Sequence, residues 1–116
     1  MSRLTGKIAL ITGASKGIGA SIAKNLGAEG ATVVVNYATS HEGAERTVAE
    51  IVKHGGHAWA VQGDFSKPEE ITRTFAEIEK RHGKLDVLVN NASVAGFGAL
   101  ESITAEEFHR LFVRTS

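Results

Sequence analysis

The sequence predicts an α/β fold in which a parallel β-sheet is covered by helices on both faces. Short apolar runs alternate with segments in which apolar residues recur every third or fourth position, so that predicted strands and helices follow one another four times. The apolar runs are continuous rather than alternating with polar residues, which is typical of strands that are buried on both faces. Parallel strands need crossover connections, and the intervening helices supply them.

Four apolar runs are the predicted strands. They span residues 8–11, 33–35, 58–61 and 85–89, and Asp86 is the one charged residue within them. The first run ends at Thr12-Gly13, the second at Asn36, the third at Gln62-Gly63-Asp64 and the fourth at Asn90-Asn91. Because polar residues and glycines favour turns, each run has a defined end.

Each predicted strand is followed by a helical pattern. The apolar stripes of these helices are Ile18, Ile22 and Leu26, then Ala44, Val48 and Ile51, then Ile71, Phe75 and Ile78, and finally Phe108, Leu111 and Phe112. Ser66 and Glu69 have the spacing of a capping box, with Pro68 in the first turn, so we expect Ser66 to cap the third helix. Thr104 and Glu107 have the same spacing before the fourth stripe.

Composition limits the classes of function. The chain of 116 residues has 13 Lys and Arg and 13 Asp and Glu, and it has no cysteine. The absence of cysteine excludes disulfides, thiolate zinc sites and a cysteine nucleophile. A neutral charge balance argues against nucleic acid or an anionic membrane as the main partner, and no apolar run approaches the ~18 residues of a membrane span. We expect a soluble, cytoplasmic single domain without a metal site, because His54 and His57 have no third ligand nearby and are typical of turns.

A glycine-rich loop connects the first strand to the first helix. It reads Thr-Gly-Ala-Ser-Lys-Gly-Ile-Gly over residues 12–19, hereafter the glycine loop. The amides at the start of a helix, together with the helix dipole, attract a phosphate. Gly13, Gly17 and Gly19 fit the three roles that such a loop requires: a tight turn, a close approach of backbone to a diphosphate, and close helix–strand packing. The alternative is a glycine-rich turn that binds nothing, but the strand before it and the helix after it favour nucleotide binding.

The end of the second strand favours NADP over NAD. An acidic residue there would bind the ribose 2′-hydroxyl of NAD and repel a 2′-phosphate. No Asp or Glu occurs between the second strand and Glu42, whereas Lys16 supplies a cation and Asn36, Thr39 and Ser40 supply hydrogen-bonding side chains. Lys16 also fits the simpler interpretation of a solvated surface lysine.

Three segments in the same order resemble the short-chain dehydrogenase/reductase family. They are the glycine loop, Asp64 after the third strand, and Asn90-Asn91-Ala92-Ser93 after the fourth, and they are most similar to bacterial NADPH-dependent oxoacyl-reductases and glucose-dehydrogenase-like members. The resemblance implies a Rossmann-type sheet of strand order 3-2-1-4, an adenine contact at Asp64, and a cofactor running along the Asn-Asn-Ala segment, with Ser93 where the family has glycine. The residues expected to contact the cofactor are Gly13, Ser15, Lys16, Gly17, Ile18, Gly19, Asn36, Asp64, Asn91 and Ala92. Asp64 and the asparagines also fit the simpler interpretation of residues that form turns.

The family's catalytic residues have no counterpart in these residues. The resemblance implies hydride transfer between a nicotinamide and a carbonyl or alcohol, with a Tyr-x-x-x-Lys pair, an upstream serine and an asparagine on the fourth helix. The single tyrosine, Tyr37, lies at the wrong end of the sheet and is followed four residues later by His41, while the asparagine position falls on Thr115. We therefore expect residues 1–116 to be a partial NAD(P)-binding Rossmann domain, truncated after four strands and not catalytic by itself.

The last residues are the part of the chain least similar to the family. Residues 113–116 are what a frameshift or an alternative gene end would leave. A sheet that stops at residues 85–89 would have an open edge, from which we expect self-association. Two alternatives to an oxidoreductase part remain: a non-catalytic nucleotide-binding or interaction module, and a truncated remnant without function.

Overall fold

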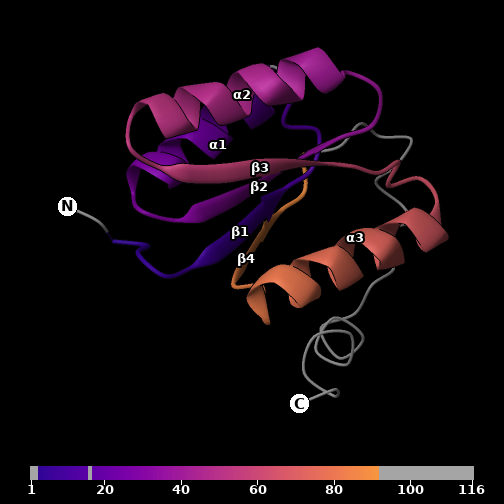
Figure 1. The fold of residues 1–116 in the computed structure, drawn as a ribbon. Coiled ribbons are helices and arrows are strands. Elements are labelled where there is room, and N and C mark those ends of the chain that lie inside the picture. Colours follow the sequence, from indigo (N-terminus) through magenta and orange to yellow (C-terminus); the bar gives the residue numbers. More distant parts are fainter. Residues whose placement is uncertain (1–2, 16, 92–116) are drawn as a thin grey trace.

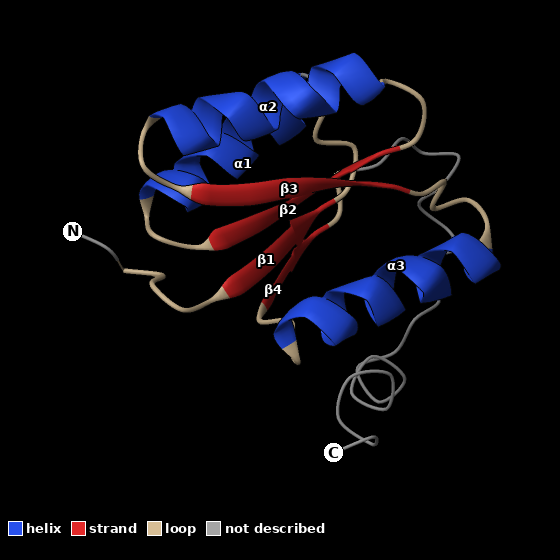
Figure 2. Cartoon of the chain, in the orientation of Figure 1, coloured by secondary structure: helices blue, strands red, loops and turns tan. Residues whose placement is uncertain are grey.

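A computed structural model describes residues 3–15 and 17–91, and it shows a parallel sheet between two layers of helices (Figures 1 and 2). The elements are β1 (Ile8–Ile11), α1 (Gly17–Ala28), β2 (Thr32–Tyr37), α2 (His41–Lys53), β3 (His57–Gln62), α3 (Pro68–His82) and β4 (Val87–Val89). The sheet order is β3-β2-β1-β4 and every pairing is parallel. The predicted fold class and strand order are therefore confirmed. The predicted helix that contains Phe108 lies outside the described residues.

The two central strands are the most buried part of the sheet. β1 pairs with β2 from Ile8↔Thr32 to Ile11↔Val35, and with β4 from Ala9↔Val87 to Ile11↔Val89. All of β1 and the middle of β2 are buried, but β3 and β4 are only partly buried. The prediction that all four strands are buried on both faces is thus right for the centre but not for β3 and β4, because each of these has a neighbouring strand on one side only within the described sheet.

Alternation along β1 divides the core into two layers of different character. Ile8 and Leu10 face α3, together with Phe65, Phe75 and other large side chains. The opposite face, covered by α1 and α2 (Figure 2), is built largely from small residues. These residues are Ala9, Ile11, Ala14, Ala23, Ala31, Val33, Val35, Ala44 and Ile51. Small side chains let α1 and α2 approach the sheet closely, and this brings their first turns next to the glycine loop.

Helix α3 begins differently from the sequence prediction. Its N-cap is Lys67, without a side-chain hydrogen bond, and Pro68 takes the first helical position. The predicted cap, Ser66, instead donates from its amide (3.0 Å) and its hydroxyl (2.6 Å) to Oδ1 of Asp64. The capping-box prediction is wrong because the Ser66 hydroxyl is hydrogen-bonded within the turn to Asp64 and does not bond the helix backbone. The helix ends at Gly83, whose φ of 76° is readily available only to glycine.

β4 is shorter than predicted because Asp86 precedes it. The Asp86 carboxylate accepts a hydrogen bond from the Ile8 amide (2.8 Å) and lies 3.3 Å from Nζ of Lys84. Desolvation opposes ionisation, but the Ile8 amide and the Lys84 ammonium outweigh it and lower the pKa of Asp86. Asp86 therefore holds the start of β1 beside the start of β4. Within the described part of the chain, no helix is long and apolar enough to cross a membrane.

Trp59 connects β3 to the end of α3. It is half-buried against the core layer beneath α3. Its indole Nε1 donates to Nε2 of His82 (3.0 Å), and the Arg81 guanidinium lies 3.9 Å from the ring centroid. Burial, with a smaller contribution from the charge of Arg81, lowers the pKa of His82. Both effects favour the neutral imidazole that accepts this hydrogen bond.

Candidate nucleotide-binding site

The glycine loop turns between β1 and α1 at the carboxyl edge of the sheet (Figure 1). Gly13 and Gly17 have φ values of 63° and 65°, a conformation that is strained for residues with a side chain. A Cβ added to Gly17 would meet no atom of the described residues within 4 Å, so the described structure leaves space beside this glycine. The loop therefore presents bare backbone toward the edge of the sheet.

Gly19 is required for close packing rather than for its dihedral angles. A Cβ at this position would lie 2.5 Å from the Gly13 carbonyl oxygen and would collide with Nδ2 of Asn91. Helix α1 thus passes against the loop and against the end of β4 at this point. This contact agrees with the packing role predicted for the third glycine.

The loop amides divide into an inner and an outer group. The Gly13 amide donates to Oδ1 of Asn36 (3.4 Å) and the Ala14 amide to the Asn36 carbonyl (3.0 Å). The amides of Ser15, Gly17 and Ile18 have no acceptor within the described residues. They precede or begin α1, where first-turn N–H groups have no partner inside the helix.

Charge at the helix starts distinguishes α1 from the other helices. The first turn of α2 contains Glu42, and that of α3 contains Glu69 and Glu70, whereas α1 has no acidic residue there. A carboxylate in the first turn offsets the positive end of a helix dipole. The dipole of α1 is left without such a group, and together with the three outer amides it suits an anionic ligand.

Asn36 has a different environment from the one that we predicted. It is 3% exposed, and its Nδ2 donates to the carbonyls of Val61 (3.4 Å) and Gly63 (3.2 Å) while its Oδ1 accepts from Gly13. The side chain connects the glycine loop, β2 and the turn after β3. Its polar side-chain atoms are buried and bonded within the protein, which does not favour the predicted hydrogen bond to a cofactor phosphate, and that contact stays a prediction.

Ile18 also departs from its predicted place in an apolar stripe. Its side chain is 74% exposed, and the buried face of α1 is formed by Gly19, Ala20, Ala23 and Gly27. A large apolar side chain therefore stands in the open beside the outer amides. This exposure is compatible with the predicted cofactor contact and does not fit a helix-packing role.

The end of β4 is tied to the glycine loop through Thr12. The buried Thr12 hydroxyl donates to Oδ1 of Asn90 (3.2 Å) and accepts from the Asn91 amide (2.8 Å). Nδ2 of Asn91 donates to the Gly13 carbonyl (3.3 Å). The two asparagines thus connect the end of β4 to the glycine loop. Ala92 and Lys16, which we also expected to contact a cofactor, lie outside the described residues.

Asp64 begins a turn and keeps one carboxylate oxygen uncommitted. The hydrogen bonds from the hydroxyl and amide of Ser66 to Oδ1 lower the pKa of Asp64, so it is ionised at neutral pH. Its amide donates to Oε1 of Glu70 (2.7 Å). Oδ2 has no partner within the described part of the chain, so the turn-forming role and the predicted adenine contact are compatible.

Two residues of α2 that we did not predict shape the loop from outside. A Cβ on Gly43 would lie 2.5 Å from the Ser15 carbonyl oxygen, so α2 contacts the loop backbone directly. Thr47 is 2% exposed. Its hydroxyl donates a hydrogen bond to the Ala14 carbonyl at 3.1 Å. Both residues lie on the buried side of α2. The sequence feature that could have identified Thr47 is that it is a polar residue on an otherwise apolar stripe.

The other two residues that we expected to hydrogen-bond a cofactor phosphate lie between β2 and α2. Thr39 is exposed, and Ser40 is the N-cap of α2, where its hydroxyl accepts from the Gly43 amide (3.3 Å). Tyr37 packs edge-to-face on His41 with ring centroids 5.4 Å apart. Among the described residues, no three His, Asp or Glu side chains are grouped as metal ligands.

Comparisons with known proteins agree on one family. The family model described as short chain dehydrogenase matches residues 7–115. A short-chain dehydrogenase/reductase of Pestalotiopsis microspora is 52% identical over 110 residues, which is 95% of this chain and 42% of that protein. Versicolorin reductase 1 of Aspergillus parasiticus is 49% identical over 110 residues, with the same two coverages of 95% and 42%. The chain thus spans about two-fifths of the length of these relatives.

Solved structures show the same fold. A metagenomic short-chain oxidoreductase in complex with NADP superposes with a TM-score of 0.80 at 33% identity, over 96% of this chain and 57% of that one. A short chain dehydrogenase of Burkholderia cenocepacia, also in complex with NADP, gives 0.75 at 41% identity, over 97% of this chain and 47% of that one. The family match, these relatives and the geometry of the glycine loop together show that the chain belongs to the short-chain dehydrogenase/reductase family.

Proposed function

We propose that this chain is the NADP(H)-binding part of a short-chain oxidoreductase that transfers hydride between a nicotinamide and a carbonyl or alcohol. The observation that carries the proposal is the set of amides at Ser15, Gly17 and Ile18 that have no acceptor among the described residues, at a helix start that has no acidic residue. A diphosphate is the ligand that such a helix start favours. The NADP complexes of two structural relatives support the choice of nucleotide.

The loop would hold the diphosphate through its outer amides. Gly13 would set the turn, Gly17 would leave the open space that the diphosphate fills, and Gly19 would keep α1 close to the loop. The exposed Ile18 side chain would cover one side of the cofactor, and Lys16 would add a cation. When bound, the nicotinamide supplies the hydride chemistry.

The adenosine and nicotinamide ends would contact different residues. Oδ2 of Asp64, which has no partner among the described residues, would accept a hydrogen bond from the adenine amino group. Asn91 and Ala92 would lie along the cofactor beyond the loop, at the end of β4. Thr39, at the end of β2, would face the ribose, where no carboxylate precedes Glu42 to repel a 2′-phosphate.

We further propose that these 116 residues bind the cofactor without catalysing hydride transfer. A phenol of ordinary pKa near 10 needs assistance to exchange protons at neutral pH. The one tyrosine, Tyr37, has His41 rather than lysine four residues later and packs against that ring. Incubation with NADPH and a panel of aldehydes and ketones should give no turnover, and measurable reduction by the purified chain would overturn this statement.

A matched pair of glycine variants tests cofactor binding. Gly17 and Gly55 both have positive φ (65° and 87°), and at either position an added Cβ meets no atom of the residues that the structure describes. Alanine at either site should therefore cost a similar stability of about 1–2 kcal/mol. Only Gly17→Ala should weaken NADPH binding, by about tenfold or more (~1.4 kcal/mol), because its Cβ occupies the proposed diphosphate position.

Fluorescence titration with NADPH and NADH is the direct measurement. The unsubstituted chain and Gly55→Ala should bind NADPH in a saturable way and more tightly than NADH. The proposed function fails if the folded chain binds neither nucleotide. It also fails if both glycine variants lose equal affinity, because backbone strain alone would then explain the effect.

A second candidate function is association through the edge of β4. Val87–Val89 is an apolar strand that is half-buried, and within the described sheet its only neighbouring strand is β1. Open strand edges pair readily with another chain. Sedimentation velocity over a range of concentrations should show a mass that rises with concentration, whereas a constant monomer mass would refute this candidate.

A further inference from the structure

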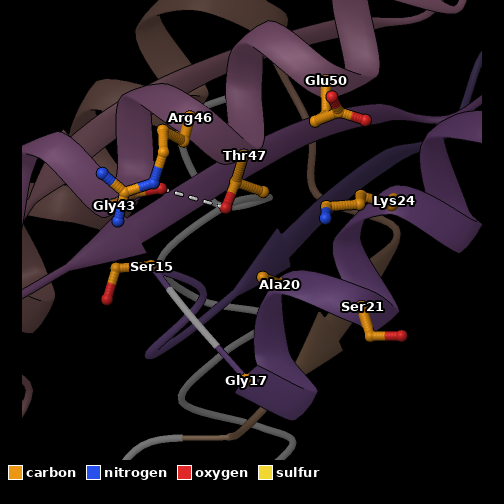
Figure 3. Close-up of a pocket in the computed structure, with 9 residues that line it drawn as sticks. All are labelled: Ser15, Gly17, Ala20, Ser21, Lys24, Gly43, Arg46, Thr47 and Glu50. Atoms are coloured by element: carbon orange, nitrogen blue, oxygen red, sulfur yellow. Dashed lines mark hydrogen bonds between the residues drawn. The ribbon is translucent and has the colours of Figure 1, made fainter.

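A hollow of about 400 Å³ lies between α1 and α2, next to the glycine loop (Figure 3). Its lining includes Ser15 and Gly17 from the loop end, and three charged residues from the two helices, Lys24, Arg46 and Glu50. Neither Lys24 nor Arg46 forms an ion pair with any residue that the structure describes. Among the described residues, the hollow therefore has two cations without an ion-pair partner and one carboxylate, which suits an anionic ligand.

Arg46 is placed to reach the loop end of this hollow. It lies one turn after Gly43, the residue whose Cα approaches the Ser15 carbonyl too closely for any side chain. Side chains on a helix lean toward its N-terminus. Figure 3 shows the Arg46 side chain directed back along α2 toward Gly43, on the side of the hollow where Ser15 lies.

The start of α2 also adjoins the end of β2. Only Ala38, Thr39 and Ser40 separate β2 from α2. In dinucleotide-binding sheets the end of the second strand lies beside the 2′ position of the adenosine ribose. A cation that reaches the first turn of α2 from the hollow is thus near both the proposed diphosphate position and the proposed ribose position.

We propose that Arg46 is a specificity-determining residue that binds the 2′-phosphate of NADP. This inference rests on the proposed function and adds a residue to the same site. A guanidinium offers several N–H donors in a planar fork that matches phosphate oxygens, and it keeps its charge at every physiological pH. Because the end of β2 has no carboxylate before Glu42, Arg46 supplies attraction at a place where NAD-specific sheets have a repulsive acid.

Lys24 supplies a matched control in the same hollow. It is seven residues after Gly17, about 10 Å further along α1 at the rise of an α-helix. Lys24→Gln and Arg46→Gln remove the same charge from two exposed helix positions. If the hollow acts only through its overall charge, both substitutions should weaken NADPH binding. If Arg46 contacts the 2′-phosphate directly, only Arg46→Gln should weaken it.

The experiment measures the dissociation constants of NADPH and NADH for the full chain and three variants. Arg46→Gln should raise the NADPH constant by about tenfold, equivalent to about 1.4 kcal/mol, and should leave the NADH constant within about twofold. Lys24→Gln should leave both constants within about twofold. Arg46→Lys keeps the charge without the fork and should fall between the parent and Arg46→Gln.

Two results overturn the inference. One is an Arg46→Gln variant that binds NADPH as tightly as Lys24→Gln does, and the other is an equal loss of NADPH and NADH. If the parent binds both nucleotides and Arg46→Gln changes neither, only this inference fails. If the folded parent binds neither nucleotide, the proposed function fails as well. Thermal unfolding of each variant separates lost binding from lost folding, and an exposed arginine substitution should shift it little.

Discussion

Replacing Asn36 tests whether its side chain stabilises the fold or contacts the cofactor phosphate, as the sequence predicts. Asn36→Ala removes an acceptor from the Gly13 amide (3.4 Å) and a donor from the carbonyls of Val61 (3.4 Å) and Gly63 (3.2 Å). The three distances are at or beyond the long end of the range for hydrogen bonds. We therefore assign a loss of about 1 kcal/mol in the free energy of unfolding to each buried group that loses its partner. The free energy of unfolding should fall by about 3 kcal/mol, which for a domain of this size is roughly 10–15 °C in Tm.

Urea and thermal unfolding followed by far-ultraviolet circular dichroism measure this loss. A reduced urea midpoint with an unchanged slope would show that stability, rather than the compactness of either state, has changed. Thr39→Ala is the matched control, because Thr39 is exposed and three residues further along. It should stay within about 0.5 kcal/mol of the parent. An Asn36→Ala variant of parental stability that nevertheless binds NADPH more weakly would refute our interpretation and restore the phosphate contact.

Three further substitutions test the contacts around the loop and the pH dependence of the fold. Gly43→Ala places a Cβ 2.5 Å from the Ser15 carbonyl oxygen and should destabilise the chain by about 1–3 kcal/mol in urea unfolding. Thr47→Val removes the buried hydroxyl that donates to the loop and should cost about 1–2 kcal/mol in the same assay. Because the folded pKa of His82 is lowered, the unfolded chain takes up this proton first as pH falls, so stability should decrease below about pH 6.5 and level off below the folded pKa. His82→Gln, which still accepts from the Trp59 indole without titrating, should flatten that part of the profile, and an unchanged profile would contradict the assignment.

The family assignment rested on features that are local in the chain. Apolar runs, helical stripes and the three glycines of the loop depend on spacings of a few residues, and backbone geometry converts such spacings directly into strands, helices and turns. Gly13 and Gly17 are examples, because a positive φ is a property of one residue. The failed capping box at Ser66 was also local, but two local motifs competed there, and the turn with Asp64 prevailed.

By itself, the sequence determined the α/β class, the strand order implied by the family resemblance, and the place of the glycine loop. Tertiary structure alone decided which polar groups remain available to a ligand. Asn36 bonds with residues 23 to 27 positions away, and Asn91 reaches Thr12 and Gly13 across 78 or 79 positions. Arg46 likewise lines the same hollow as the loop residues Ser15 and Gly17 because α2 packs against the loop at Gly43. A side chain's hydrogen-bonding capacity is a property of its residue type, but whether the protein or a ligand uses that capacity depends on what the fold places next to it.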